Sequence, residues 1–172
     1  MKEWGPPDSG ALLGFFVSPA DRKSQRILEG IKVLVVDDLE DNRIMLFWIL
    51  NGAGAIVRAE ESVDQALVAI GEFKPDVIVS DISMPHRDGH DLIRTLRKGI
   101  EAHEGHKTPA IAVSAHTNPE LKHKSLSEGF QVHIDKPVDR QLLVGLVKVL
   151  AERDGKAVKY GFDPSAYLSS SG

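Results

Sequence analysis

The most regular feature of the chain is an alternation of short apolar runs and longer amphipathic segments that begins at residue 31. The runs are rich in β-branched residues, as buried parallel strands are, and they cover 31–36, 55–59, 77–80, 110–113 and 130–134. Apolar positions at helical spacing predict helices over 43–51, 62–73, 89–98, 119–127 and 138–153, with a polar loop over 99–108. Five strand–helix repeats predict an α/β domain with a doubly wound parallel sheet and helices on both faces.

The segments on either side of this pattern are less regular. We expect residues 1–29, with several Gly and Pro positions, to form an N-terminal extension or linker. Residues 30–152 then form the domain, and residues 153–172, which end in Ser-Ser-Ser-Gly, form a C-terminal tail. A length of 172 residues suits one such domain and is short for two.

Composition and charge exclude several classes of protein. The net charge of -4, with Lys and Arg scattered along the chain, does not provide the basic surface that nucleic-acid binding needs. The chain has no cysteine, which excludes disulfides, thiolate catalysis and cysteine-based zinc sites. The apolar stretch 11–17 is too short to span a membrane, and its acidic upstream flank is unlike a signal peptide. We therefore expect a cytoplasmic protein that contacts neither membranes nor nucleic acid directly.

Chemically active side chains follow four of the five predicted strands. The first strand ends in Asp37 and Asp38, the third in Asp81 and the fourth in Ser114, and the fifth leads to Lys136. Because ligands bind beyond the carboxyl ends of the strands in such sheets, we expect these groups to converge. Three neighbouring carboxylates need a cation, and Mg²⁺ prefers oxygen ligands. With a carboxylate nucleophile, a lysine and a hydroxyl, the set predicts a phosphoryl-transfer site.

Four separated motifs resemble the receiver domain of two-component response regulators. They are Val-Leu-Val-Val-Asp-Asp at 33–38, Asp-Val-Ile-Val-Ser-Asp-Ile-Ser-Met-Pro at 76–85 with Asp-Gly at 88–89, Pro-Ala-Ile-Ala-Val-Ser-Ala at 109–115, and Gly-Phe at 129–130 with Lys-Pro at 136–137. The resemblance covers about residues 30–152. It is specific because the motifs come in the family's order at the expected strand ends, and it implies a flavodoxin-like (βα)5 fold.

The resemblance implies a role for each matching position. Asp81 corresponds to the phosphoacceptor. Asp37 and Asp38 correspond to the acidic pair that binds Mg²⁺ together with Asp81 and the backbone carbonyl of Ser83, and Asp38 is the expected direct ligand. Lys136 corresponds to the lysine that pairs with the phosphoryl group.

Three further positions correspond to the switch of the family. Ser114 corresponds to the hydroxyl residue that moves toward the phosphoryl group, and the bond before Pro137 to a peptide bond that is usually cis. His133 occupies the place where the family usually carries Tyr or Phe, so this chain departs from the pattern with a ring that can become charged near neutral pH. Ser83 and His116 occupy variable positions that tune the lifetime of the acyl phosphate.

The resulting prediction is a signalling switch and not an enzyme. The donor would be a histidine kinase or a histidine phosphotransfer protein. The output would be contact with a partner protein, or with a second copy, through the fourth helix, fifth strand and fifth helix. Such a domain could stand alone or belong to a hybrid histidine kinase. Two alternatives remain: a Mg²⁺-dependent phosphohydrolase, disfavoured because Ser83 stands where the second Asp would be, and a pseudo-receiver that is never phosphorylated.

Overall fold

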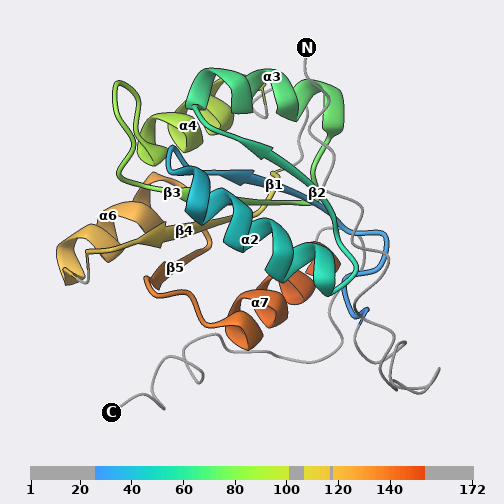
Figure 1. Ribbon diagram of the computed structural model, residues 1–172. Helices are drawn as coiled ribbons and strands as arrows, with labels where there is room; N and C mark the ends of the chain where they lie inside the picture. The colour runs from blue at the N-terminus through green and yellow to red at the C-terminus, as the bar shows by residue number, and fades with distance from the viewer. Residues whose placement is uncertain (1–25, 101–106, 117, 154–172) are drawn as a thin grey trace.

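The computed structural model describes residues 26–100, 107–116 and 118–153, which form a single sheet covered by helices on both faces (Figure 1). All strand pairs are parallel, and the strand order is β2-β1-β3-β4-β5. The strands are β1 (Lys32–Val36), β2 (Ile56–Glu60), β3 (Val77–Asp81), β4 (Ala110–Ser114) and β5 (Val132–Asp135). This topology confirms the predicted doubly wound fold.

The helices agree in number and order with the prediction and differ at their ends. They are α2 (Glu40–Gly52), α3 (Val63–Phe73), α4 (Gly89–Thr95), α6 (Pro119–Glu128) and α7 (Arg140–Arg153). The first helix begins at Glu40 instead of Arg43 because Glu40 and Asp41 suit the positive end of the helix dipole. The last helix begins at Arg140, after Asp139, whose carboxylate accepts the backbone N–H of Leu142.

The helix predicted over 89–98 changes character before it ends. Asp88 and Asp91 form a capping box at the start of α4, and the chain continues past Thr95 as a π-helical segment, η1 (Leu96–Ile100). The predicted loop over 99–108 is therefore wrong at Gly99 and Ile100, and its residues 101–106 lie outside the described residues. No helix in the described ranges is long and apolar enough to cross a membrane.

The core consists of two clusters, one on each face of the sheet. Alternate residues of β1 point to opposite faces: Val33 and Val35 pack with α2 and α7, while Leu34 and Val36 pack with α3 and α4. Strands β3 and β4 are buried along their whole length, which explains their continuous apolar character. Because β1 and β3 are neighbours at the centre, their carboxyl ends meet.

The chain just before β1 also belongs to this packed unit. Leu28 is fully buried in the cluster that contains α2 and α7, and its N–H donates to the carbonyl of Ala53 at 2.9 Å. Gly54 has a φ of 98°, and a Cβ there would lie 3.1 Å from the Cβ of Arg26. Residues 26–29 fall within the predicted extension, yet they lie against the turn between α2 and β2.

Candidate functional site

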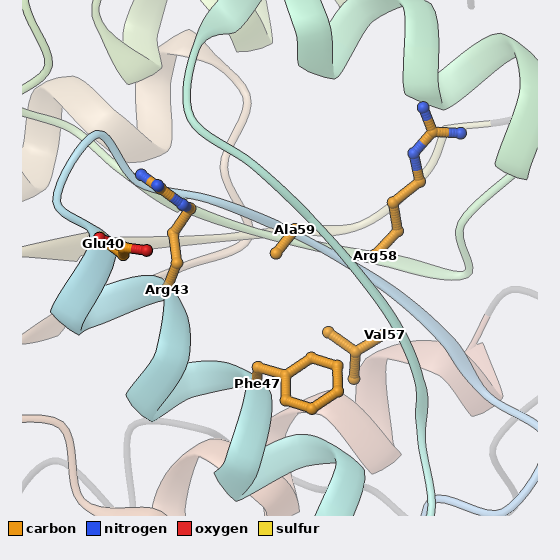
Figure 2. Close-up of a pocket in the computed structure, with 6 residues that line it drawn as sticks. All are labelled: Glu40, Arg43, Phe47, Val57, Arg58 and Ala59. Carbon is orange, nitrogen blue, oxygen red and sulfur yellow. The ribbon is translucent and has the colours of Figure 1, made fainter. Parts of the chain in front are cut away.

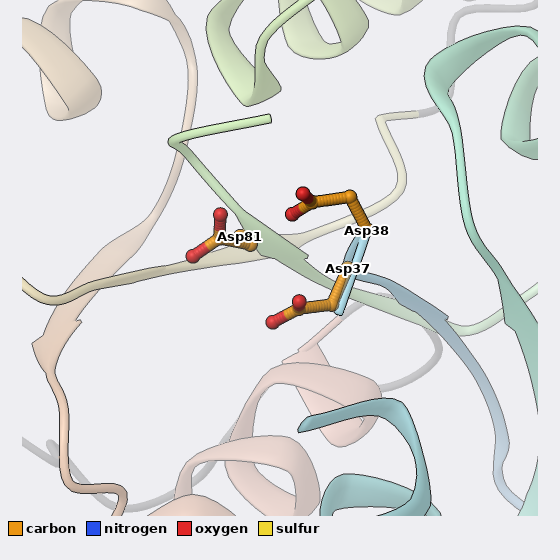
Figure 3. Close-up of side chains that lie close together, drawn as sticks. All are labelled: Asp37, Asp38 and Asp81. Atoms are coloured by element: carbon orange, nitrogen blue, oxygen red, sulfur yellow. The ribbon is translucent and has the colours of Figure 1, made fainter. Parts of the chain in front are cut away.

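Three carboxylates meet beyond the ends of the two central strands. Asp37 and Asp38 follow β1 directly, and Asp81 is the last residue of β3. One ligand atom from each lies within 4.8 Å of the other two, and Figure 3 shows the side chains gathered at this edge of the sheet. The structure thus brings together the acidic residues that the sequence placed at neighbouring strand ends.

Lys136 joins this cluster from the segment after β5. Its Nζ lies 2.8 Å from Oδ1 of Asp81 and 3.1 Å from Oδ2 of Asp37. The peptide bond between Lys136 and Pro137 is cis. The ammonium group therefore lies between two of the three carboxylates and offsets part of their negative charge.

The acidic turn is held in place by two residues of α2 that the sequence analysis missed. Asn42 donates its side-chain amide to Oδ1 of Asp37 at 3.2 Å, and that oxygen also accepts the N–H of Leu39 at 2.9 Å. Arg43 donates through Nη1 to the backbone carbonyls of Asp37 at 2.7 Å and Asp38 at 2.8 Å. The available signal was their position in the first turns of the helix that follows the acidic pair.

Burial and the Lys136 ammonium act on the pKa of Asp81 in opposite directions. Asp81 is 4% exposed, and its burial raises the pKa of the carboxyl group; Lys136 acts in the opposite direction, while Asp37 and Asp38 add to the rise. Burial alone would lower the pKa of Lys136, but its bonds to Asp81 and Asp37 outweigh that effect and raise it. One ammonium group thus pairs with two carboxylates in a cluster of three, and a further cation would favour the ionised form of Asp81.

The donor set fits a magnesium ion. Carboxylate oxygens are the ligands that Mg²⁺ prefers, and no protein nitrogen or sulfur ligand is needed. Asp37 is fully buried with its oxygens engaged, whereas Asp38 is half-buried, and no group among the described residues hydrogen-bonds to its carboxylate. Asp38 is therefore free to bind a metal directly. Ser83, the proposed source of a carbonyl ligand, lies just beyond β3 in an exposed position.

Gly89 allows α4 to begin directly against the end of β3. A Cβ at this position would overlap the carbonyl oxygen of Asp81, and the N–H of Gly89 donates to the carbonyl of Ile82 at 3.0 Å. The sequence suggested only that this glycine starts a helix. Glycine is required at this position because a side chain would collide with the backbone of Asp81. The Asp-Gly pair at 88–89 was visible in the sequence, but this contact was not.

The remaining predicted residues occupy different surroundings. Ser114 is fully buried at the end of β4, and its Oγ accepts the N–H of His116 at 3.0 Å, while the His116 side chain is exposed. His133 is 5% exposed in β5, and its Nδ1 lies 3.0 Å from Oγ of Ser125 in α6. The His133 ring thus lies inside the domain, beneath α6.

A separate cavity of about 370 Å³ lies between α2 and β2 (Figure 2). It contains none of the three carboxylates. The acidic pair at the end of β2 does not join the cluster either, because Glu60 binds Arg58 at 2.6 Å and Glu61 lies 3.8 Å from Arg43. The lining residues are Glu40, Arg43, Phe47, Val57, Arg58 and Ala59.

Comparison with known proteins places this arrangement in a family. Residues 33–148 match the response regulator receiver domain. The chain is 37% identical over 121 residues to an uncharacterized 14.6 kDa protein of Leptolyngbya boryana, covering 70% of this chain and 90% of that protein. It is 32% identical over 141 residues to hybrid signal transduction histidine kinase D of Dictyostelium discoideum, covering 79% of this chain but only 9% of the kinase.

Solved structures agree with the sequence matches. The receiver domain of the Francisella response regulator 1452 superposes with a TM-score of 0.66 and 31% identity, covering 72% of this chain and 98% of that one. Vibrio cholerae chemotaxis protein CheY4 gives a TM-score of 0.64 with 28% identity, covering 70% and 98%. Fold, motif order and relatives agree, and the chain belongs to the family of response regulator receiver domains, the signalling switches of two-component systems.

Proposed function

We propose that Asp81 accepts a phosphoryl group from the phosphohistidine of a histidine kinase or a histidine phosphotransfer protein, in the cytoplasm. The observation that carries this proposal is the position of the Asp81 carboxylate, which lies 2.8 Å from the Lys136 ammonium and beside Asp37 and Asp38. Asp37, Asp38, Asp81 and the backbone carbonyl of Ser83 would hold Mg²⁺.

The reaction is an in-line displacement at phosphorus. A carboxylate oxygen of Asp81 forms the new O–P bond while the P–N bond of the phosphohistidine breaks, and the donor imidazole leaves with that electron pair. Lys136 remains paired with the negative charge of the phosphoryl oxygens. Mg²⁺, when bound, offsets the negative charge of the carboxylates and of the phosphoryl group.

The output follows from the residues around the acyl phosphate. Ser114, at the end of the strand next to β3, would turn its hydroxyl toward the phosphoryl group and give up its bond to the N–H of His116. That movement changes the face of α6, β5 and α7, which would contact a downstream protein or a second copy of the chain. Ser83 and His116, both exposed, would control the access of water and so the lifetime of the signal.

The test is the intact mass of the full chain over time with Mg²⁺ and acetyl phosphate. We expect a transient gain of one phosphoryl group that Asp81→Asn and EDTA both abolish. Asp41→Asn is the matched control, because Asp41 is an exposed carboxylate in the first turn of α2. Release of free phosphate without an adduct would indicate the hydrolase instead, and neither adduct nor release would indicate a pseudo-receiver.

A further inference from the structure

Helix α6 carries one buried side chain among its ten residues, and that side chain is a serine. The Oγ of Ser125 lies 3.1 Å from Nε2 of His90 in α4 and 3.0 Å from Nδ1 of His133 in β5. Both rings are themselves buried, with exposed fractions of 1% and 5%. One hydroxyl therefore joins three elements through two imidazoles, away from the acidic cluster.

The donors and acceptors around Ser125 determine which nitrogen of each histidine ring carries the proton. The hydroxyl of Ser125 donates its only proton to the backbone carbonyl of Leu121, one turn earlier, at 2.9 Å. Its two lone pairs then accept from both rings, so His90 carries a proton on Nε2 and His133 carries one on Nδ1. The bond to Ser125 thus selects the tautomer of His133.

The other nitrogen of His133 faces a second acceptor. Nε2 of His133 and Oδ1 of Asp135 are both buried without a hydrogen-bond partner among the described residues, and they lie 3.8 Å apart. In the neutral ring these are two acceptors facing each other. A second proton, on Nε2, would replace this contact between two acceptors with an ion pair between the charged ring and the Asp135 carboxylate. The remaining oxygen of Asp135 is held by Nζ of Lys122 in α6 at 2.8 Å.

We infer that Ser125 is a positioning residue that holds the His133 ring beneath α6 in the Nδ1–H tautomer and thereby couples the position of α6 to the protonation of His133. The part of this inference that concerns signalling rests on the proposed function, since α6 belongs to the proposed output face. The part that concerns proton placement depends only on the contacts of Ser125 with the two rings.

The charges around His133 give the coupling its direction. Burial lowers the pKa of His133; Asp135 on its own strand raises it, and Lys122 of α6 and His90 of α4 lower it. Its partner in β4 is Ala112, which carries no charge. If α6 moves outward, Lys122 and Ser125 leave with it, so the ring becomes more exposed to water and to Asp135 and binds a proton more readily. By linkage, acidification favours the displaced position of α6.

His90 is the second anchor of the serine. Burial lowers the pKa of His90 as well, which favours the neutral form of its ring. Asp88 and Glu128 raise that pKa, while Lys124 and Arg94 lower it. Protonation of His90 keeps the proton on Nε2 and so preserves its bond to Ser125.

NMR spectroscopy of the imidazole nitrogens tests this inference, because their chemical shifts depend on which nitrogen carries the proton. Long-range proton–nitrogen NMR spectra of the full ¹⁵N-labelled chain, without phosphodonor, report the tautomer and titration of each ring. We expect His133 to show the Nδ1–H tautomer in the wild type and to lose it in Ser125→Ala. Ser125→Thr keeps the hydroxyl and should restore it. Ser127→Ala is the matched control, because Ser127 is an exposed serine of α6 whose hydroxyl donates to the carbonyl of Lys124.

A second readout tests the coupling itself. The backbone amide shifts of α6 should titrate with the midpoint of His133, and His133→Phe should abolish that step. An Nε2–H tautomer in the wild type, an unchanged tautomer in Ser125→Ala, or α6 amides that ignore the His133 titration would each overturn the inference. Failure of Asp81 to take up a phosphoryl group would instead contradict the proposed function, and the NMR result without phosphodonor would be unaffected.

Discussion

Helices α6 and α7 lie on either side of β5 in the sequence, but they attach to the domain by different forces. Helix α7 inserts a row of apolar side chains into the core, with Leu143 and Val147 fully buried and Leu150 at 3% exposure. Helix α6 buries only Ser125. Its other attachments are polar: Lys122 to Asp135 at 2.8 Å, Arg94 to Glu128 at 3.1 Å, and Arg97 to the carbonyl of Gly129 at 3.0 Å.

This difference indicates which helix of the face formed by α6, β5 and α7 can change its position. Apolar burial is non-directional and depends on neither pH nor ion pairing, so α7 stays in place when a charge changes nearby. Hydrogen bonds and ion pairs are directional, and each can be exchanged for a bond to water at a small net cost. On the proposed function, we therefore expect a phosphoryl group or a proton to shift α6 while the rest of the fold is preserved.

The largest expected effect comes from α7. Leu143→Ala should lower the free energy of unfolding by about 2–5 kcal/mol, because it leaves a cavity in the core. Leu126→Ala in α6 is the matched change at a leucine that is 49% exposed, and it should stay within about 0.5 kcal/mol of wild type. Urea unfolding measures both. Equal losses in the two variants would mean that α6 is packed as α7 is.

A smaller loss is expected when the polar anchor of α6 is removed. Ser125→Ala leaves the buried N–H of His90 without an acceptor, at about 1–3 kcal/mol for that group, while His133 moves its proton from Nδ1 to Nε2. Hydrogen exchange should quicken in α6 and remain unchanged in α7. Faster exchange spread evenly over both helices would show that the serine supports the whole domain instead.

The two buried histidines should make stability depend on pH. An unfolded histidine titrates near its ordinary pKa of 6.5, and burial lowers the pKa of both His90 and His133 in the folded chain. Below pH 6.5 the unfolded state therefore binds more protons than the folded state. The contribution of the two rings to the free energy of unfolding is fully present above that pH and is lost as the pH falls toward the lowered folded pKa values. The slope approaches about 1.4 kcal/mol per pH unit for each ring.

Urea titrations at several pH values measure how steeply the free energy of unfolding changes with pH. The change His133→Phe should remove the contribution of one ring to that slope. Asp81 acts in the opposite sense at lower pH, because its raised pKa lets the folded state bind that proton first. The Asp81→Asn background removes this contribution. A slope that His133→Phe leaves unchanged would exclude His133 as its source.

The smallest effect concerns the surface ion pair of α6. Lys122 and Asp135 are 38% and 34% exposed, so Lys122→Gln should cost at most about 1 kcal/mol, and less in high salt. The same change should raise the pKa of His133, because Lys122 lowers it. NMR titration of the ring measures that shift. A downward shift would mean that Lys122 acts on the ring mainly by keeping Asp135 in place.

Much of the fold and of the acidic site was predictable because local pattern and topology agree. The strands β1, β3 and β4 are buried, so their apolar runs were unambiguous, and the carboxyl ends of parallel strands lie at one edge of the sheet. Asp37, Asp38, Asp81 and Lys136 could be placed together for that reason. Element ends were less predictable, since caps such as Asp139 act through a few hydrogen bonds.

The residues that escaped prediction act through contacts that exist only once the elements are packed together. Arg43 reaches backbone carbonyls of the acidic turn, and Gly89 matters because α4 starts against Asp81. Ser125 joins His90 and His133, which are 35 and 8 residues away from it. Nothing in the pattern of a mostly polar helix predicts that its one inward side chain binds two imidazoles, because that depends on how closely α4, α6 and β5 approach.

The burial of Leu28 determines where the N-terminal boundary of the domain should be placed when it is fused to another protein. Its side chain fills space in the core next to α2 and α7, although it precedes the first strand and lies upstream of the region shared with the family. A domain transplanted from Ile31 onward would carry an unfilled hole, at a cost of the order of 2–5 kcal/mol for a lost buried leucine. A graft that begins at Arg26 keeps this leucine and its backbone hydrogen bond to Ala53, so the fusion point is anchored to the core two residues after the join.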